Sequence, residues 1–475
     1  MIVIVSAVVA AGAAAMLPAL VTGVIYREWA DTLALAAAAT IGLTVGLLGR
    51  RYGGGSGGFT SSEGFAAVAL SWIILILFGT LPYLFSGALP GLIDPLFETA
   101  AGFTTTGATT LVDPRELSHA MLLWRATCQW VGGMGIIVLS IAVLPILGAG
   151  GVELARAEAP GPELERMTPR FRKTAERLWW LYLGFTVLLS IILSFGDMKV
   201  FDAIAHGMTT ISTGGFSTEP GSIGAFSAYT QWVIIAFMLM SATSFALHFR
   251  AWRRPRAYLE SKEFLAYISI VGVAVVIVAI GTWSLGSGIE ARIRDAVFTG
   301  VTMVTGTGYA TSNWAAWGPG LLLVLLVCMF LGGMAGSTAG AIKTYRLGIL
   351  FKTINSSLRR IVYPRVVAVQ RFEGRSVDSR LVHGVVAFFV LYVGFFVAGA
   401  ILLGFFEPDL DLVSIGSASA SAMGNIGPAL GELGPTATYS GLGVDSKLTL
   451  ALLMIIGRLE IYPVIILVTH RWWRR

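Results

Sequence analysis

Long apolar runs recur along the whole chain, and they restrict its possible folds more than any other feature. A helix needs about 20 apolar residues to cross the hydrocarbon core of a bilayer. Inside that core the chain itself must satisfy its backbone groups, which helices of this length do. We therefore expect an all-α integral membrane protein, with ten transmembrane helices at residues 2–25, 32–49, 64–87, 118–147, 176–195, 228–250, 264–286, 319–350, 381–406 and 446–469.

Charged residues are scarce and unevenly placed. They make up only 13% of the chain, against 55% hydrophobic residues and a mean hydropathy of +0.77, which is far from the average of soluble proteins. The basic residues gather in alternate loops, chiefly 156–177, 250–262 and 343–380. Because cytoplasmic loops carry the excess of Lys and Arg, we expect both termini in the cytoplasm. The net charge of +6 thus reflects topology, and no nucleic-acid partner is expected.

A shorter pattern occurs four times between the apolar runs. An aspartate is followed twelve or thirteen residues later by a glycine set among small hydroxyl or amide residues. The pairs are Asp94–Gly107, Asp202–Gly214, Asp295–Gly308 and Asp411–Gly424. The segments 94–112, 197–218, 291–312 and 409–428 are too short and too rich in glycine to cross and return as regular helix, so we expect four re-entrant pore loops.

Each expected pore loop lies between two expected spans, which indicates a pseudo-four-fold arrangement of helix–pore-loop–helix repeats. The predicted division is an N-terminal two-helix extension at 1–62, followed by repeats at 63–155, 156–255, 256–365 and 366–475. Four such loops arranged in a ring would surround one pore.

The glycine loops contain groups that can bind a cation. Non-helical backbone at membrane depth is tolerated only next to protein or a water-filled cavity, and inward-pointing carbonyls can replace the hydration shell of an ion. Glycine reaches the backbone angles that this arrangement needs. The candidate ligands are Thr105, Thr106, Gly107, Ser212, Thr213, Gly214, Thr307, Gly308, Tyr309, Met423, Gly424 and Asn425.

Other chemistries find little support in the sequence. Cys128 and Cys328 lie inside predicted spans and far apart, as expected of packing residues. The five histidines lack metal-ligand spacing, and no nucleophile–base constellation is visible. We therefore expect no enzymatic activity and no bound organic cofactor.

The loop sequences TTTGAT, ISTGGF, TGTGYA and MGNIGP occur together with GGMAGSTAGAIK at 332–343 and GRLEIYPV at 457–464. In this order they resemble the TrkH/KtrB/HKT superfamily of potassium transporters, most of all its bacterial TrkH members, over essentially the whole chain. The resemblance implies K+ as the transported ion and the bacterial cytoplasmic (inner) membrane as the location. It also implies a homodimer with one pore per subunit and a cytoplasmic TrkA-like regulatory subunit that binds nucleotides.

Within that resemblance, glycine at the key position of all four loops accompanies potassium selectivity, and the spacing assigns Gly107, Gly214, Gly308 and Gly424 to it. The fourth loop has Met423 where the others have threonine, so the ring is not four-fold symmetric.

The apolar run 319–350 is interrupted by a glycine-rich stretch that is too flexible and polar to stay helical in lipid. The resemblance implies an intramembrane loop here that blocks the pore from the cytoplasmic side. The candidate gate residues are Gly332, Gly333, Gly336, Ser337, Thr338, Gly340, Lys343 and Arg458. An unpaired arginine at the centre of a span costs about 2.5–3.5 kcal/mol, so Arg458 should face the loop or the pore. Lys343 is expected to extend toward the cytoplasmic interface.

Two transport mechanisms are open. One is channel-like permeation of K+ through a selectivity filter, and the other is symport of K+ with H+ or Na+. Coupled transport usually needs an ionisable residue at membrane depth. Apart from Arg458 and Glu460 we expect none there, which favours the channel-like mechanism.

Overall fold

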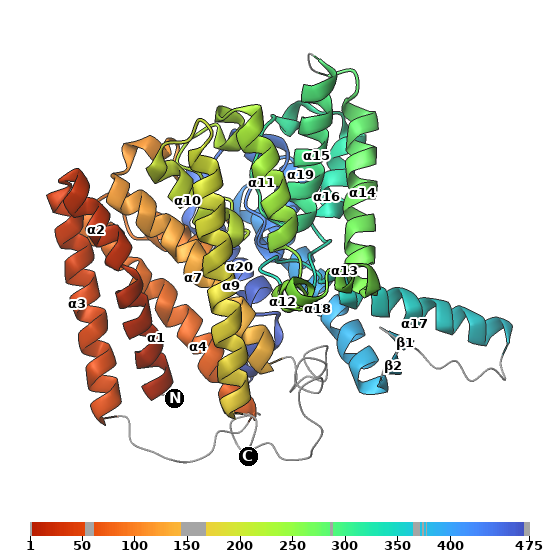
Figure 1. Ribbon diagram of the computed structural model, residues 1–475, viewed down its shortest axis with the longest axis horizontal. Helices are drawn as coiled ribbons and strands as arrows, with labels where there is room; N and C mark the ends of the chain where they lie inside the picture. The colour runs from red at the N-terminus through yellow and green to blue at the C-terminus, as the bar shows by residue number, and fades with distance from the viewer. Residues whose placement is uncertain are drawn as a thin grey trace.

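The computed structural model describes residues 2–52, 61–143, 168–285, 288–363, 371–372, 375–376 and 378–469. Helices dominate this part of the chain (Figure 1). The strands it contains are β1 (Arg371–Phe372) and β2 (Arg375–Ser376), which pair antiparallel in one small hairpin. The prediction of an all-α architecture is confirmed.

The described residues form a series of α-helices of four to 28 residues. They are α1 (Ile2–Ala15), α2 (Leu17–Tyr26), α3 (Trp29–Tyr52), α4 (Ser61–Gly79), α5 (Leu81–Ser86), α6 (Ile93–Phe103), α7 (His119–Val143), α9 (Thr168–Ser194), α10 (Val200–Ile211), α11 (Ala228–Ser241), α12 (Phe245–Arg253), α13 (Ala257–Glu260), α14 (Lys262–Thr282), α15 (Ile289–Thr305), α16 (Pro319–Cys328), α17 (Thr344–Val362), α18 (Ser379–Phe406), α19 (Leu412–Gly424), α20 (Val444–Arg458) and α21 (Tyr462–Val468).

Several helices have the length and apolar composition of membrane spans. Within the described residues there are six of them, or up to eight if each of two bent helix pairs is counted as one span. The chain is therefore a multi-pass membrane protein, while the predicted number of ten crossings stays a prediction.

Two predicted spans are wrong as continuous helices. The run 228–250 bends by 97° between α11 and α12, and the run 446–469 bends by 115° between α20 and α21. At the second bend Glu460 and Ile461 have positive φ, and Pro463 lacks an N–H that could continue the helix. At the first bend, tertiary partners described below replace the helical hydrogen bonds. Hydropathy detects neither bend because both sides stay apolar.

The N-terminal helices α1, α2 and α3 pack against one another and against α4 and α7. Glu28, between α2 and α3, holds them to the start of α7. Its carboxylate accepts the backbone N–H groups of His119 at 2.9 Å and Ala120 at 2.8 Å, and contacts the His119 ring. Burial raises the pKa of Glu28, but these hydrogen bonds outweigh it and leave the pKa below its ordinary value.

Four short helices, α6, α10, α15 and α19, precede the glycine loops. Each packs against the long helix that precedes it, which is α4 for α6. In addition, α10 contacts α7, α15 contacts α11, and α6 contacts α20, each a helix of the neighbouring repeat. In Figure 1, α10, α15 and α19 lie in the upper half of the molecule, and α17 extends sideways from the bundle. This arrangement brings the ends of the short helices toward a common centre.

Candidate functional site

The chain leaves all four short helices in the same way. One residue adopts positive φ, and the backbone N–H of the next residue reaches a carbonyl oxygen five residues back, at 2.8–3.1 Å. Two residues after the first comes a glycine with positive φ. The positive-φ residues are Thr105, Thr213, Gly306 and Asn425, and the glycines are Gly107, Gly215, Gly308 and Gly427. We call residues 104–107, 212–215, 305–308 and 424–427 the four ring segments.

The ring segments touch in a closed cycle. A Cβ added to any of the four glycines would collide with a carbonyl oxygen of another segment. The collisions join Gly107 to Gly214, Gly215 to Thr307, Gly308 to Ile426, and Gly427 to Thr106. In every case the oxygen belongs to the residue just before the partner's own glycine. The ring is therefore assembled from backbone, and glycine is required where the segments meet.

This geometry corrects the alignment predicted from the aspartate spacing. Gly215 and Gly427, not Gly214 and Gly424, correspond to Gly107 and Gly308. The residue that matches Thr106 in the fourth segment is Ile426 and not Met423. The error arose because Asp411 caps the start of α19 and lies 16 residues before Gly427, whereas the other three aspartates lie inside their helices, 13 residues before the ring glycine. In the second segment Gly214 and Gly215 are adjacent, so the spacing alone did not show which of them is the ring glycine.

The predicted ligands Met423 and Gly424 lie at the end of α19: Met423 precedes the fourth ring segment, and Gly424 is its first residue. The Gly424 carbonyl accepts the Ala341 N–H at 3.0 Å. A Cβ on Gly457 of α20 would strike the Met423 carbonyl oxygen. Ser212 and Thr213 fall in the second ring segment, and Ser212 is fully buried.

Free carbonyl oxygens line up in the ring. Within the described residues, the carbonyls of Thr106, Thr307 and Ile426 accept no hydrogen bond from the protein. The Gly214 carbonyl accepts one from the side chain of Gln129, at 2.6 Å. The buried side-chain oxygens Oγ1 of Thr105 and Oδ1 of Asn425 also lack a protein partner. Buried acceptors normally find a donor or a ligand, so these atoms are available to a cation.

Side chains around the ring hold it in place. Tyr309, a predicted ligand, points its hydroxyl to Thr209 at 2.6 Å and Thr210 at 3.1 Å, so its side chain braces α10. Asn425 donates to Thr106 Oγ1 at 3.0 Å and to the Met454 carbonyl at 2.9 Å. Among the residues missed by the sequence analysis, Gln129 holds the second segment, and Tyr439 donates to the Gly427 carbonyl at 2.8 Å. Polar residues inside an apolar run, such as Gln129, were the available signal.

The run 319–350 is interrupted as predicted, with α16 ending at Cys328 and α17 beginning at Thr344. Between them the chain crosses under the ring, on the side where the short helices end. Thr338 donates its hydroxyl to the Ile211 and Ser241 carbonyls, each at 3.1 Å. Residue Met334 donates to the Ala242 carbonyl at 2.9 Å. These bonds explain the bend after α11, because its carbonyls turn to this segment.

The candidate gate residues gather in this segment, which we call the crossing segment and define as residues 332–343. A Cβ on Gly340 would collide with the Gly424 carbonyl, and one on Gly333 would lie 2.5 Å from the Ala242 carbonyl oxygen. Gly336 has φ of 73° and accepts the Phe245 N–H at 3.1 Å. The Ser337 hydroxyl donates to the Met334 carbonyl, and the Gly332 carbonyl accepts the hydroxyl of Thr344, the residue that follows the segment. Glycine here permits close backbone packing beneath the ring.

Arg458 lies against the crossing segment, as expected. It is 2% exposed and donates to the carbonyls of Thr338 at 2.8 Å and Gly132 at 3.2 Å. The expectation for Lys343 is wrong. Its side chain does not extend to the interface but is 4% exposed and turns back to the Ala339 carbonyl. The segment's own carbonyls satisfy the ammonium group locally, which hydropathy does not reveal.

Glu98 on α6 is a further carboxylate buried within the protein. It is 1% exposed and pairs with Arg125 on α7. The sequence analysis missed this pair because the apolar runs do not reveal how α6 packs against α7. A second ion pair, Arg346 with Glu460, joins α17 to the bend after α20 at 2.6 Å. A third, Lys447 with Asp94, joins α20 to α6 at 2.6 Å.

The family model for TrkH, described as a cation transport protein, matches residues 54–472. This chain belongs to the TrkH family. The Trk system potassium uptake protein TrkH of Escherichia coli (strain K12) is 40% identical over 427 residues, which cover 88% of this chain and 87% of that protein. TrkH of Salmonella typhimurium is 38% identical over 471 residues, or 97% of this chain and 95% of that protein.

A solved TrkH structure has the same fold. The crystal structure of the potassium transporter TrkH from Vibrio parahaemolyticus matches with a TM-score of 0.92 and 33% sequence identity, covering 100% of this chain and 99% of that one. The predicted family resemblance is confirmed. The TrkH relatives are transporters, so this chain is a membrane transport protein and not an enzyme.

Proposed function

We propose that this TrkH-family protein takes up potassium through a channel-like pore whose selectivity filter is the four ring segments. The closed cycle of Gly107, Gly215, Gly308 and Gly427 against neighbouring carbonyls carries this proposal. A ring of carbonyl oxygens can replace the hydration shell of a potassium ion. The named activity of the Escherichia coli relative, potassium uptake, supports K+ as the ion.

The proposed ligands are the backbone carbonyls next to the four glycines. Thr106, Thr307 and Ile426 offer carbonyls without a protein partner, and Gly214 offers one that is shared with Gln129. Thr105 and Asn425 would add side-chain oxygens on the inner side. In this assignment the residues that break the four-fold symmetry of the ring are Asn425 and Ile426, and not Met423 as predicted. Fewer equivalent ligands give fewer well-defined ion sites than in a symmetric ring.

The crossing segment would be the gate. It lies under the ring and is attached there by Thr338 and by Arg458, whose positive charge opposes the passage of cations. A flexible, glycine-rich segment held by a few hydrogen bonds can move aside without disturbing the ring.

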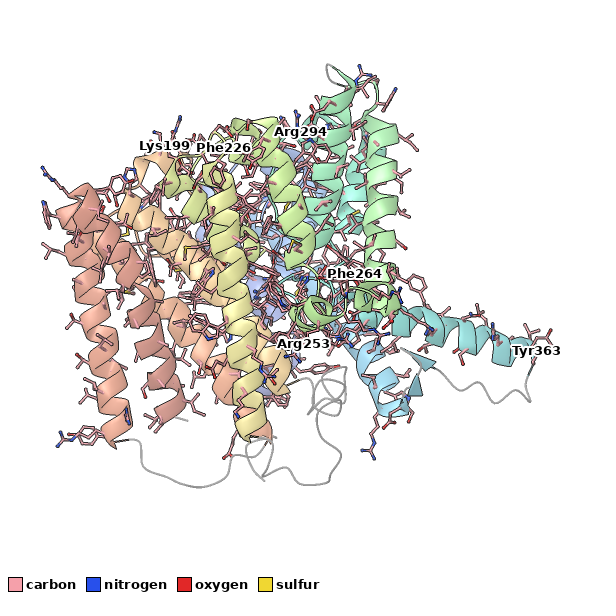
Figure 2. All side chains as sticks on the ribbon, viewed as in Figure 1. Lys199, Phe226, Arg253, Phe264, Arg294 and Tyr363 are labelled. Atoms are coloured by element: carbon pink, nitrogen blue, oxygen red, sulfur yellow. The ribbon has the colours of Figure 1, made fainter. Side chains whose placement is uncertain are left out.

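The remaining proposals concern topology and partners. Ten spans with four re-entrant loops, divided into the predicted extension and four repeats, would leave both termini on the cytoplasmic side of the inner membrane. In Figure 2, Arg253 of the predicted basic loop 250–262 lies in the lower half of the molecule. A homodimer and a TrkA-like, nucleotide-binding subunit docked on the cytoplasmic side complete the proposal. Residues 156–167 and 364–370, which are parts of the predicted basic loops 156–177 and 343–380, fall outside the described residues.

Symport is the second candidate, and the buried carboxylate Glu98 is the observation in its favour. However, the carboxylate of Glu98 is hydrogen-bonded to Arg125 and to the chain that follows the first ring segment. Because these partners occupy both carboxylate oxygens, Glu98 has a structural role in this proposal, which favours the channel-like mechanism.

Reversal potentials in liposomes distinguish the two mechanisms. For a channel, the reversal potential of the purified protein should follow the potassium gradient and stay unchanged when a proton gradient is imposed, while a sodium gradient should shift it only as far as the potassium-to-sodium permeability ratio allows. Symport would shift it by an amount set by the coupled ion and its stoichiometry. Protein-free liposomes provide the control, and a shift with the proton gradient, or a shift with the sodium gradient that follows a fixed stoichiometry, would contradict channel-like permeation.

A further inference from the structure

Behind the first ring segment lies an ion pair that is shielded from solvent. Glu98 of α6 and Arg125 of α7 have side chains 0% and 3% exposed, and the Arg125 Nε lies 2.5 Å from the Glu98 Oε1. Removing two charges from water is costly unless additional hydrogen bonds satisfy them. Both charges have such bonds, and the partners lie in the stretches of chain that follow the first and the second ring segment.

The carboxylate of Glu98 binds the stretch of chain that follows the first ring segment. It accepts the Thr109 hydroxyl at 3.0 Å and the Thr110 N–H at 3.2 Å. Thr109 comes two residues after the ring glycine Gly107. The pair therefore fixes the distance between the short helix α6 and the outer end of the first ring segment.

The guanidinium of Arg125 holds the second ring segment. It donates from Nη1 to the Ser217 carbonyl at 3.0 Å and lies over the Phe216 ring, 3.6 Å from the ring centroid. These residues directly follow the ring glycine Gly215. A single ion pair thus connects the chain that follows the first ring segment to the chain that follows the second.

The same position is used differently around the ring. Glu98 lies nine residues before Gly107, and His206 lies nine residues before Gly215. His206 contacts Ser217 Oγ at 3.0 Å, as Glu98 contacts Thr109. The matching residues in the third and fourth repeats are Thr299, whose hydroxyl lacks a partner within the described residues, and Ala418. The first two repeats thus use this position as a polar strut, whereas in the fourth the Ser421 and Ser417 hydroxyls of α19 accept the Gly427 N–H at 3.0 Å and the Leu430 N–H at 2.8 Å. A strut at this particular position is therefore not a general requirement of the fold.

We propose, on the basis of the function proposed above, that Glu98 and Arg125 are positioning residues for ion selectivity. The pair sets the spacing between the first and second ring segments without touching the ion. Discrimination between K+ and Na+ depends on how the carbonyl oxygens are held around the ion. Without the strut these two segments can relax inward, and the smaller ion gains ligands.

The test measures potassium-to-sodium permeability ratios from reversal potentials in liposomes. Arg125→Lys keeps the charge but loses the fork that reaches Glu98 and Ser217 together, and Glu98→Gln removes the charge of the acceptor. Both variants should lower the ratio about tenfold, as expected for the loss of one charge-assisted hydrogen bond. Thr109→Val leaves the ion pair intact and should lower the ratio about threefold, since it removes one neutral hydrogen bond.

A purely structural role would give a different pattern. The double variant Glu98→Gln with Arg125→Gln leaves no unpaired buried charge, so it should regain the thermal stability lost in Glu98→Gln while its permeability ratio stays low. The control is Arg294→Lys, because Arg294 pairs with Glu290 at the outer end of α15 and touches no ring segment (Figure 2). Its ratio should match that of the wild type.

The two proposals can fail separately. Wild-type protein that carries no potassium would contradict the proposed function itself. A selective wild type together with unchanged ratios in Arg125→Lys and Thr109→Val would overturn only the positioning role. If Glu98→Gln does not fold, Thr109→Val still decides, since it preserves the buried ion pair.

Discussion

Replacing Gly107 with serine is expected to lower the potassium-to-sodium permeability ratio about tenfold. Gly107 has φ of 79°, and a Cβ there would collide with the Gly214 carbonyl oxygen. A residue with a Cβ in this region costs about 1–2 kcal/mol, and about 1.4 kcal/mol corresponds to tenfold in an equilibrium. The strain should displace a carbonyl of the ring and leave the rest of the fold intact. Reversal potentials in liposomes give the ratio.

Two further substitutions make this test specific for the ring. Gly215→Ser should reproduce the effect of Gly107→Ser, because the two glycines occupy equivalent positions. Gly416→Ser is the matched control, since Gly416 lies in α19 with no heavy atom near its would-be Cβ. An unchanged ratio in Gly107→Ser and Gly215→Ser, in folded protein, would remove these segments from the filter.

Freeing the crossing segment is expected to raise basal potassium flux roughly tenfold while selectivity is kept. In Arg458→Ala the segment loses a charge-assisted hydrogen bond to the Thr338 carbonyl, and such bonds contribute about 1.5–3 kcal/mol. Deleting residues 336–340 removes Thr338 and with it the hydrogen bonds to the Ile211 and Ser241 carbonyls and to Arg458. Rubidium uptake into proteoliposomes measures the flux.

The folded state of both variants is checked by size-exclusion chromatography. Arg253→Ala is the control, because Arg253 is an exposed arginine on α12 away from the segment. Flux at or below the wild-type level in a folded deletion variant would refute the gate assignment and leave the filter assignment untouched.

Much of the fold could be predicted from local patterns. Apolar runs of helical length and glycine-rich interruptions depend on neighbouring residues only, so the helical membrane architecture and the break after Cys328 were accessible from the sequence. The bend after Ser241 was not, because the Ser241 and Ala242 carbonyls bind the distant residues Thr338 and Met334. The bend after Arg458 was not either, because it depends on positive φ at Glu460 and Ile461, which these residue types rarely adopt. The same holds for Lys343, which is satisfied by a folded-back carbonyl.

The alignment of the site shows a similar limit. The aspartate-to-glycine spacing found three of the four loops nearly in register, and failed in the fourth, where Asp411 caps α19 instead of lying inside the helix. Correct alignment requires the backbone angles, since Gly215 and Gly427 differ from their neighbours by conformation and contact, not by residue type. Glu98 and Arg125 were missed because their pairing depends on how α6 packs against α7, which no local pattern reveals.

Rubidium diffraction tests the central claim most directly. Crystals grown with rubidium in place of potassium should show anomalous density on the axis of the ring, between the carbonyl oxygens of Thr106, Gly214, Thr307 and Ile426. Rubidium density at other places in the molecule, with none between these four oxygens in well-ordered ring segments, would contradict the assignment of the ring as the potassium filter.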